Sequence, residues 1–464
     1  MTDFLPGTRS SGQKNFYGKA LRLVLPIVVQ NLLSATISST DIVMLNYVDQ
    51  ASISAVSLAV NYTNILFMFF YGLGAGVTML GSQYHGKGDL EAVHLVEGMA
   101  LRLSILMAML FTAAAVFIPG PMMLVFTSDP ELISIGSVYL RVVCASYMFW
   151  SITEIYMSTL RSTGRVAICT GINIIAFICN ILMNLVFIFG LLGMPRLGAA
   201  GVALGTTISR FLALICCVIV SARSRDVRIR PSYMFRHNPV LFGDFLRMAL
   251  PALLNDIIWG VAFSLYSSIM GHLGSDAIAA YSFVNIVRHF GTVMCFAVGS
   301  ATGILLGNLL GEGREKEARE GAKSLMVMTV ASGLLGGLVI LLLIPFILRF
   351  ADLSPQAMHY LKYMMLINTY YVMGVAVNTT LITGVFRAGG DSRFGMICDA
   401  IDMWGYALPL GFTAAFVLRL PVLWVYFLLC TDEFVKWPWV FRHYFSGKWV
   451  KNITRDYESE GQVP

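Results

Sequence analysis

Charged residues are scarce in this sequence. Only 12% of its 464 residues are Asp, Glu, Lys or Arg, whereas an ordinary soluble domain has roughly 25%. Apolar residues make up 57% of the chain, and the mean hydropathy is +0.73. A soluble chain of this length would need far more polar surface to cover its core. The composition therefore excludes a soluble globular protein and indicates a membrane protein with many spans.

Motifs of enzyme, metal and disulfide chemistry are also missing. The sequence has no HExxH, P-loop or GxSxG pattern and no CxxC pair. Its eight cysteines all lie in apolar runs, which favours buried thiols over a disulfide framework. Residues 1–18 are polar and lack the features of a cleavable signal peptide, so we expect the first apolar segment to stay as a span. We predict no enzymatic activity, no resident metal and no cofactor.

Twelve apolar segments are present, and each is long enough to cross a membrane, which takes roughly 20 residues. Polar breaks with turn residues separate them, among them "GKGD" at 86–89 and "GEGRE" at 311–315. The predicted spans are about 19–46, 52–80, 94–117, 133–158, 164–191, 196–221, 244–270, 276–309, 320–348, 357–386, 392–417 and 421–443.

The basic residues orient these spans. If both termini are inside, the outer loops hold only Arg196, Arg349 and Arg419 of the 32 basic residues. Basic residues are concentrated on the cytoplasmic side of membrane proteins, so we predict that both termini are cytoplasmic. The net charge of +6 follows from this topology and does not indicate a nucleic-acid partner.

The chain also repeats itself. Three stretches of the first half recur in the second half at an offset of 225 or 226, namely 25–57 with 250–282, 81–92 with 307–318, and 160–165 with 386–391. The repeats predict an all-α polytopic membrane protein with two pseudo-symmetric six-helix lobes, residues 1–232 and 233–464. Because each lobe has an even number of spans, both lobes have the same orientation in the membrane. Secondary transporters with this arrangement work by rocking one lobe against the other around a site near the middle of the bilayer.

This plan resembles the multidrug and toxic compound extrusion (MATE) family. The resemblance rests on "LP" near the start of both halves, "GKGD" and "GEGRE" after the second span of each, and "LRSTG" and "FRAGG" after the fourth, and it covers about 20–450. The tail 420–454 is similar to a bacterial branch near the DinF-like members. The resemblance implies an antiporter of the bacterial cytoplasmic membrane that exports cationic or amphipathic organic compounds against inward flow of H+ or Na+. We expect a monomer whose partners are these small molecules and the lipid bilayer.

Two alternatives stay open. A lipid-linked oligosaccharide flippase has a similar lobed fold, but it tends to carry a strongly cationic cavity, and this chain has mainly Arg288 and Arg210 at membrane depth. A membrane-embedded enzyme or a non-transporting receptor is the alternative from another class, and the absence of motif-bearing loops speaks against it.

An acid stands in the middle of the first span. Asp41 lies in "SSTDIVMLNYV" (38–48), and an ionised carboxylate at a helix centre costs roughly 3 kcal/mol in hydrocarbon. Its own helix offers no base at i±3 or i±4. We predict that Asp41 exchanges between neutral and charged forms and couples ion entry to substrate release; a purely structural acid is the alternative. Glu154, on span four, either lines the cleft or extends to the membrane surface.

Span five presents a row of amides. Asn173, Asn180 and Asn184 are spaced i, i+7 and i+11, so they share a helix face and must hydrogen-bond inside the membrane, if only between helices. The resemblance places an Asp of span one beside a polar pair of span five and a Thr of span six, matched here by Asp41, Asn180, Asn184 and Thr206. Many members have an acid where Asn184 stands, so the resemblance favours H+ over Na+, with Na+ at Asp41, Asn180 and Asn184 as the alternative.

The second half holds its own charged set. Asp256, Arg288, Asp399 and Asp402 all fall in apolar spans, and the last two are spaced i, i+3 on one face. We predict that Arg288 neutralises Asp256 or Asp399, because buried charges need partners. The set is a candidate for ion coupling or substrate binding, and a structural ion pair is the alternative. Na+-coupled members of the family carry an acid on span ten, and 357–386 has none.

Overall fold

Helices make up nearly all of the structure. The computed structural model describes residues 11–45, 50–224, 226–236, 238–351 and 353–456. Within these ranges there are helices, turns and loops and no strand, which confirms the all-α prediction.

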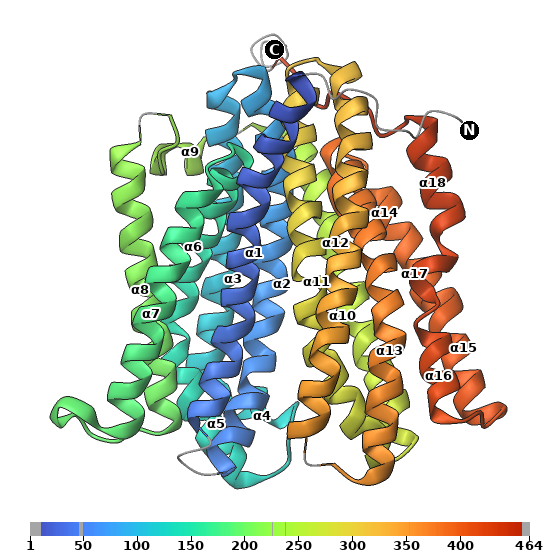
Figure 1. The fold of residues 1–464 in the computed structure, drawn as a ribbon. Coiled ribbons are helices and arrows are strands. Elements are labelled where there is room, and N and C mark those ends of the chain that lie inside the picture. Colours follow the sequence, from blue (N-terminus) through green and yellow to red (C-terminus); the bar gives the residue numbers. More distant parts are fainter. Residues whose placement is uncertain (1–10, 46–49, 225, 237, 352, 457–464) are drawn as a thin grey trace. The chain divides into compact units, whose positions relative to one another are not determined.

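The helices follow the predicted spans closely (Figure 1). Those of the first half are α1 (Ser11–Leu45), α2 (Gln50–Lys87), α3 (Leu90–Phe117), α4 (Pro119–Leu124), α5 (Pro130–Val143), α6 (Ala145–Ser162), α7 (Val166–Phe189), η1 (Leu191–Gly193), α8 (Ala199–Arg223) and α9 (Pro231–Phe235). Those of the second half are α10 (Pro239–His272), α11 (Ser275–Gly311), α12 (Glu315–Phe350), α13 (Pro355–Asn378), η2 (Thr379–Phe386), α14 (Ser392–Asp399), η3 (Ala400–Ala407), α15 (Leu408–Phe412), η4 (Thr413–Val417), α16 (Val422–Leu429), α17 (Asp432–Val435) and α18 (Trp437–Ser446).

Ten helices of the described chain are long and apolar enough to cross a membrane, and the pair α5 and α6, bent by 50°, makes an eleventh. The structure corrects two details of the prediction. Span 133–158 is bent between α5 and α6, and span 421–443 is not one helix but three short ones, α16 to α18. The second interruption has a physical reason, because charged residues and Pro438 interrupt the apolar run there.

The repeated motifs form the same turn in both halves. Gly88 and its counterpart Gly313 have φ of 84° and 75°, and Gly164 and its counterpart Gly390 have φ of 77° and 74°. Each glycine ends a helix in the left-handed conformation that residues with a Cβ disfavour. In each turn the next residue's N–H donates to the carbonyl five residues earlier, at 2.9 Å in all four cases. The internal repeat is therefore a structural repeat.

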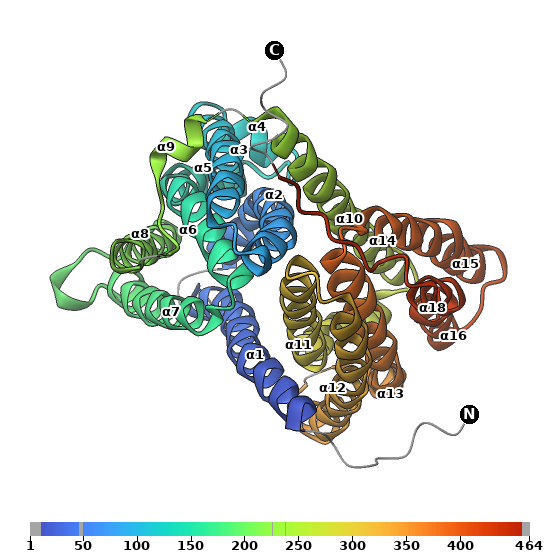
Figure 2. The same ribbon diagram turned by 90° about the horizontal axis from the view of Figure 1, so that it is seen from above.

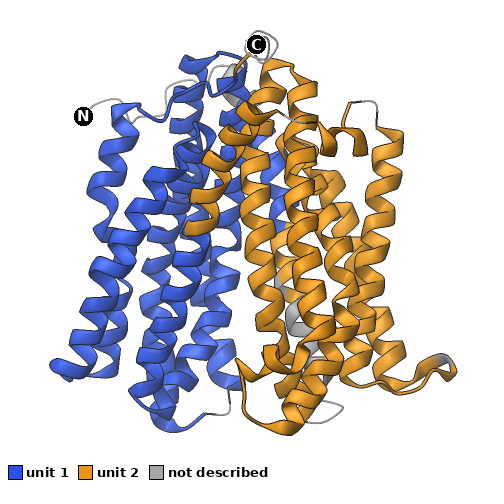
Figure 3. Ribbon diagram, turned by 180° about the vertical axis from the view of Figure 1, so that it is seen from behind, with its two compact units in different colours: residues 1–28, 255–454 blue, residues 29–254, 455–464 orange. Residues whose placement is uncertain are grey.

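The chain folds into two compact units, coloured separately in Figure 3. Unit 1 contains residues 1–28 and 255–454, and unit 2 contains residues 29–254 and 455–464. The division falls inside α1 and α10 and not in the linker between the halves. The lobe boundary at residue 232 stays a prediction, since the units follow packing and the lobes follow the repeat.

Each unit has its own packed core. In unit 2, α2, α3 and α6 pack against one another, as the end-on view of Figure 2 shows, around buried side chains such as Phe70 and Tyr147. In unit 1, α11, α12 and α13 form the corresponding group around residues such as Tyr371 and Tyr426. Small residues let the helices approach closely; a Cβ on Gly74 of α2 would lie 2.5 Å from the hydroxyl of Ser158 on α6.

Candidate functional site

Two asparagines and a threonine meet between α7 and α8 in unit 2. Asn180 Nδ2 donates to Thr206 Oγ1 at 3.5 Å, and Asn184 Nδ2 donates to Asn180 Oδ1 at 3.4 Å. Asn180 is 2% exposed and Asn184 is fully buried. The structure thus brings together three of the four residues that the family resemblance places at the first site.

Glycines on α8 make this contact possible. A Cβ at Gly205 would lie 2.3 Å from Asn184 Oδ1, and one at Gly201 would lie 2.9 Å from the carbonyl oxygen of Phe187. Gly201 and Gly205 are spaced i, i+4 and form the small-residue face through which membrane helices pack closely. Because α8 approaches α7 at this point, Thr206 is held beside the amide pair.

Asp41 belongs to α1, but its side chain lies outside the part of the structure that is described. Its placement beside the amides therefore stays a prediction. A different residue of α1 does contact α7 in unit 2. The side chain of Gln30 donates to Thr170 Oγ1 at 2.8 Å and to the carbonyl oxygen of Val166 at 3.2 Å, and Gln30 is buried.

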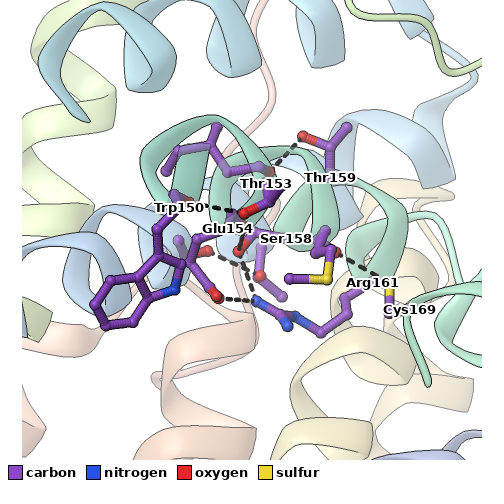
Figure 4. A network of polar contacts seen from close by, with 11 residues as sticks. Trp150, Thr153, Glu154, Ser158, Thr159, Arg161 and Cys169 are labelled. Atoms are coloured by element: carbon purple, nitrogen blue, oxygen red, sulfur yellow. Dashed lines mark hydrogen bonds and ion pairs between the residues drawn. The ribbon is translucent and has the colours of Figure 1, made fainter. Parts of the chain in front are cut away.

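Glu154 forms an ion pair within its own helix, as Figure 4 shows. Arg161 Nη2 donates to Glu154 Oε1 and to Ser158 Oγ, both at 2.7 Å. The side chains of Glu154 and Arg161 are 12% and 21% exposed. The carboxylate of Glu154 is therefore neutralised by a partner two turns further along α6.

The charged residues of unit 1 pair differently from the prediction. Arg387 Nη2 lies 3.5 Å from Asp256 Oδ1, and Lys436 Nζ lies 2.9 Å from Asp399 Oδ1. The predicted partner, Arg288, forms no ion pair with either acid in the described structure. Its guanidinium carbon instead lies 4.6 Å from the ring centre of Phe263, a cation–π contact. The prediction that Arg288 neutralises these acids is wrong, because tertiary packing brings other cations closer.

Lys436 is the centre of a cluster of which the sequence prediction named only Asp399 and Asp402. Besides Asp399, its ammonium lies 3.3 Å from Glu433 Oε2 and 3.6 Å from Asp402 Oδ2. We call Asp399, Asp402, Asp432, Glu433 and Lys436 the Lys436 cluster; none of the five is more than 3% exposed. The signal that could have revealed it is "DEFVK", three charges within five residues of the apolar segment 421–443.

Two polar side chains from other helices donate hydrogen bonds to this cluster. Tyr266 of α10 donates its hydroxyl to Asp432 Oδ2 at 3.2 Å. Asn378, the last residue of α13, donates from Nδ2 to Glu433 Oε2 and to the carbonyl oxygen of Glu433, each at 2.5 Å. No three His, Cys, Asp or Glu side chains in the described ranges are arranged to hold a metal ion.

Comparisons with known proteins agree with this architecture. The MatE family model matches residues 26–186 and 251–413. The uncharacterized transporter YisQ of Bacillus subtilis is 21% identical over 92% of this chain and 94% of its own. The probable multidrug resistance protein NorM of Thermotoga maritima is 21% identical over 95% of each chain. The multidrug resistance protein PmpM of Pseudomonas aeruginosa is 22% identical over 85% of this chain and 83% of its own.

Solved structures share the fold. An outward-facing multidrug resistance MATE family transporter of the MOP superfamily has a TM-score of 0.84 at 17% identity, and the match covers 95% of this chain and 100% of that one. A MOP superfamily transporter from Pyrococcus furiosus has a TM-score of 0.83 at 16% identity with the same coverage. The all-α, MATE-like membrane fold that the sequence predicts is therefore confirmed.

Proposed function

This chain belongs to the MatE family, and from that premise we propose that it is an H+-coupled antiporter that exports cationic or amphipathic organic compounds by alternating access. Two of the relatives above are named for multidrug resistance, which supports drug export and favours it over a lipid-linked oligosaccharide flippase. We place the protein in the bacterial cytoplasmic membrane with both termini inside, since the outer loops hold few basic residues.

The observation that carries the coupling proposal is the buried amide pair with its hydroxyl neighbour. Asn180, Asn184 and Thr206 bring hydrogen-bonding groups but no charge. An amide can donate to a carboxylate and accept from a carboxylic acid, so such neighbours suit an acid that must visit both forms. A Na+ site would gain from a second carboxylate, because hard cations prefer charged oxygen ligands. In this proposal Asp41 is the carboxylate of the site, and its three described neighbours bring no second one, which favours H+.

The contact between α1 and α7 supports placing Asp41 at the same depth in the membrane as Asn180. Gln30 touches Thr170, and both helices start from the same predicted side of the membrane. At a rise of about 1.5 Å per residue, Asp41 lies about 16 Å beyond Gln30 and Asn180 lies about 15 Å beyond Thr170. Gln30 and Asp41 are also separated by about three turns, so they share a face of α1.

The test is gradient-driven efflux of ethidium, a planar organic cation, from proteoliposomes. We expect an imposed pH gradient to drive export by the wild type and a Na+ gradient at constant pH to drive none. Asp41→Asn should fold and bind ethidium, because the amide mimics the protonated acid, yet it should lose gradient-driven export. Asp129→Asn is the matched control, since Asp129 is an exposed acid that caps α5 and Asn caps equally well. An Asp41→Asn protein that exports at the wild-type rate would refute the assignment.

A further inference from the structure

The Lys436 cluster carries more negative than positive charge. Four carboxyl groups belong to it, and three of them lie within 3.6 Å of the single ammonium. Of the other intramembrane cations described in unit 1, Arg387 is paired with Asp256, and Arg288 has aromatic contacts and no ion pair in the described structure. Apart from Asp256 with its partner Arg387, the groups that face the cluster from the surrounding helices are neutral in their ordinary forms. They are the Tyr266 hydroxyl and the Asn378 amide, which hydrogen-bond to it, and the side chains of Tyr370, Tyr371, Cys398 and Cys430.

This imbalance cannot persist as bare charge in a buried site. Transferring an uncompensated carboxylate out of water costs far more than a protein of ordinary stability can offset, and buried acids bind protons instead. One ammonium compensates one carboxylate in full. The remaining acids of the Lys436 cluster must therefore share protons while the site is closed to water.

The hydrogen bonds point to the atoms that take these protons. Neither carboxyl oxygen of Asp402 has a hydrogen-bond partner, and neither has Oε1 of Glu433. The amide oxygen of Asn378 is likewise unpartnered and 3% exposed, although the same amide faces Glu433 through Nδ2. Buried acceptors without a donor are costly. A proton on Glu433 or Asp402 removes a buried negative charge and supplies an O–H donor to a site that is rich in acceptors.

The local backbone is irregular where these residues stand. Asp402 lies in the π-helical segment η3, Asn378 directly precedes the π-helical segment η2, and Glu433 and Lys436 lie at the interruption between α16 and α18. π-helical turns occur frequently at functional sites. Three interrupted helices thus converge on one buried charged group.

We propose that the Lys436 cluster is a proton-binding site in unit 1, with Asp402 and Glu433 as the groups that gain and lose protons and Lys436 as the fixed cation that holds them. Each uptake converts a carboxylate and a proton from water into a carboxylic acid, and release reverses it. The site gives the transporter a second place for protons besides Asp41, and this role in coupling rests on the proposed function.

The test measures protonation itself. Infrared difference spectra of the purified full-length protein in lipid, recorded between pH steps in H2O and D2O, show protonated carboxyl groups by their isotope-sensitive C=O stretch. We expect titrating bands in the wild type that are lost in part in Asp402→Asn and in Glu433→Gln. Glu315→Gln, at an exposed position of α12, is the control and should leave them unchanged. Lys436→Met should increase the band, because the acids then lose their cation.

The outcomes separate this inference from the proposed function. Titrating bands that are identical in the wild type, Asp402→Asn and Glu433→Gln would overturn the proton site, even if ethidium efflux is intact. A wild type without gradient-driven efflux would overturn the proposed function and leave the infrared assignment standing. If Lys436→Met fails to fold, the double variant Lys436→Met with Asp399→Asn restores the charge difference of the wild type and should show its band.

Discussion

Replacing Lys436 with Met tests the electrostatics of unit 1 most directly. Met preserves most of the volume of the side chain but removes an ammonium that lies 2.9 Å from Asp399, 3.3 Å from Glu433 and 3.6 Å from Asp402. Removing one partner of a buried ion pair costs about 3–5 kcal/mol, because the other charge stays behind without compensation. For a unit of this size we expect the melting temperature to fall by roughly 6–20 °C at neutral pH.

The assay is the fraction of monodisperse protein that survives heating, measured by size-exclusion chromatography. Lys362→Met is the matched control, because Lys362 is exposed on α13 of the same unit, and exposed substitutions usually change stability by less than about 0.5 kcal/mol. The double variant Lys436→Met with Asp399→Asn should recover much of the loss, since it removes the orphaned charge as well.

The destabilisation should also depend on pH with a defined sign. Without its cation the folded variant binds more protons than the unfolded chain, so its stability rises as the pH falls. The difference in melting temperature between Lys436→Met and the wild type should therefore become smaller as the pH is lowered. A melting temperature of Lys436→Met within 2 °C of the control variant, a loss equivalent to about 1 kcal/mol or less, would refute the reasoning.

Three further predictions concern other parts of the chain. Gly205→Ala should lower the melting temperature and the rate of ethidium export, because overpacking costs about 1–3 kcal/mol. Its control, Gly171→Ala, has no atom within 4 Å of the new Cβ and should be neutral or slightly stabilising. Equal melting temperatures for the two variants would contradict the close packing of α7 and α8. Arg288→Met should lower the melting temperature less than Lys436→Met does, since Arg288 has aromatic contacts and no ion pair in the described structure. A larger loss than that of Lys436→Met would instead support the predicted ion pair of Arg288 with Asp256 or Asp399. A cysteine at Ser232 in a cysteine-free background should resist an impermeant external thiol reagent, while one at Ser128 should react; the reverse pattern would invert the topology.

The membrane spans and the repeated turns could be predicted from the sequence because each of them depends on a short stretch of neighbouring residues. A span needs only a run of apolar residues, and the repeated turns need only a glycine at the right distance from a helix end. Gly88 and Gly313 illustrate this, since both have positive φ at matching positions. The meeting of Asn180 with Thr206 also follows from helix periodicity together with the family resemblance.

The ion pairs could not be predicted in the same way. Asp256 and Arg387 are 131 residues apart, and no local pattern specifies which of several intramembrane cations comes closest. Arg387 also stands in the "FRAGG" motif, where it resembles a loop residue, yet it is buried at the end of η2. The charges of "DEFVK" escaped notice because the flanking apolar residues make the whole segment resemble one uninterrupted span.

The division of α1 between the units has a consequence for synthesis. Phe16 and Ala20 lie in the part of α1 that belongs to unit 1, and Ala20 packs in a core with Leu306 and Ala318. These partners leave the ribosome only after the whole first half has been made and inserted. Domains usually fold in the order in which they emerge, but here the first residues of α1 must wait for the second half of the chain. The first half expressed alone therefore lacks the packing partners of Ala20.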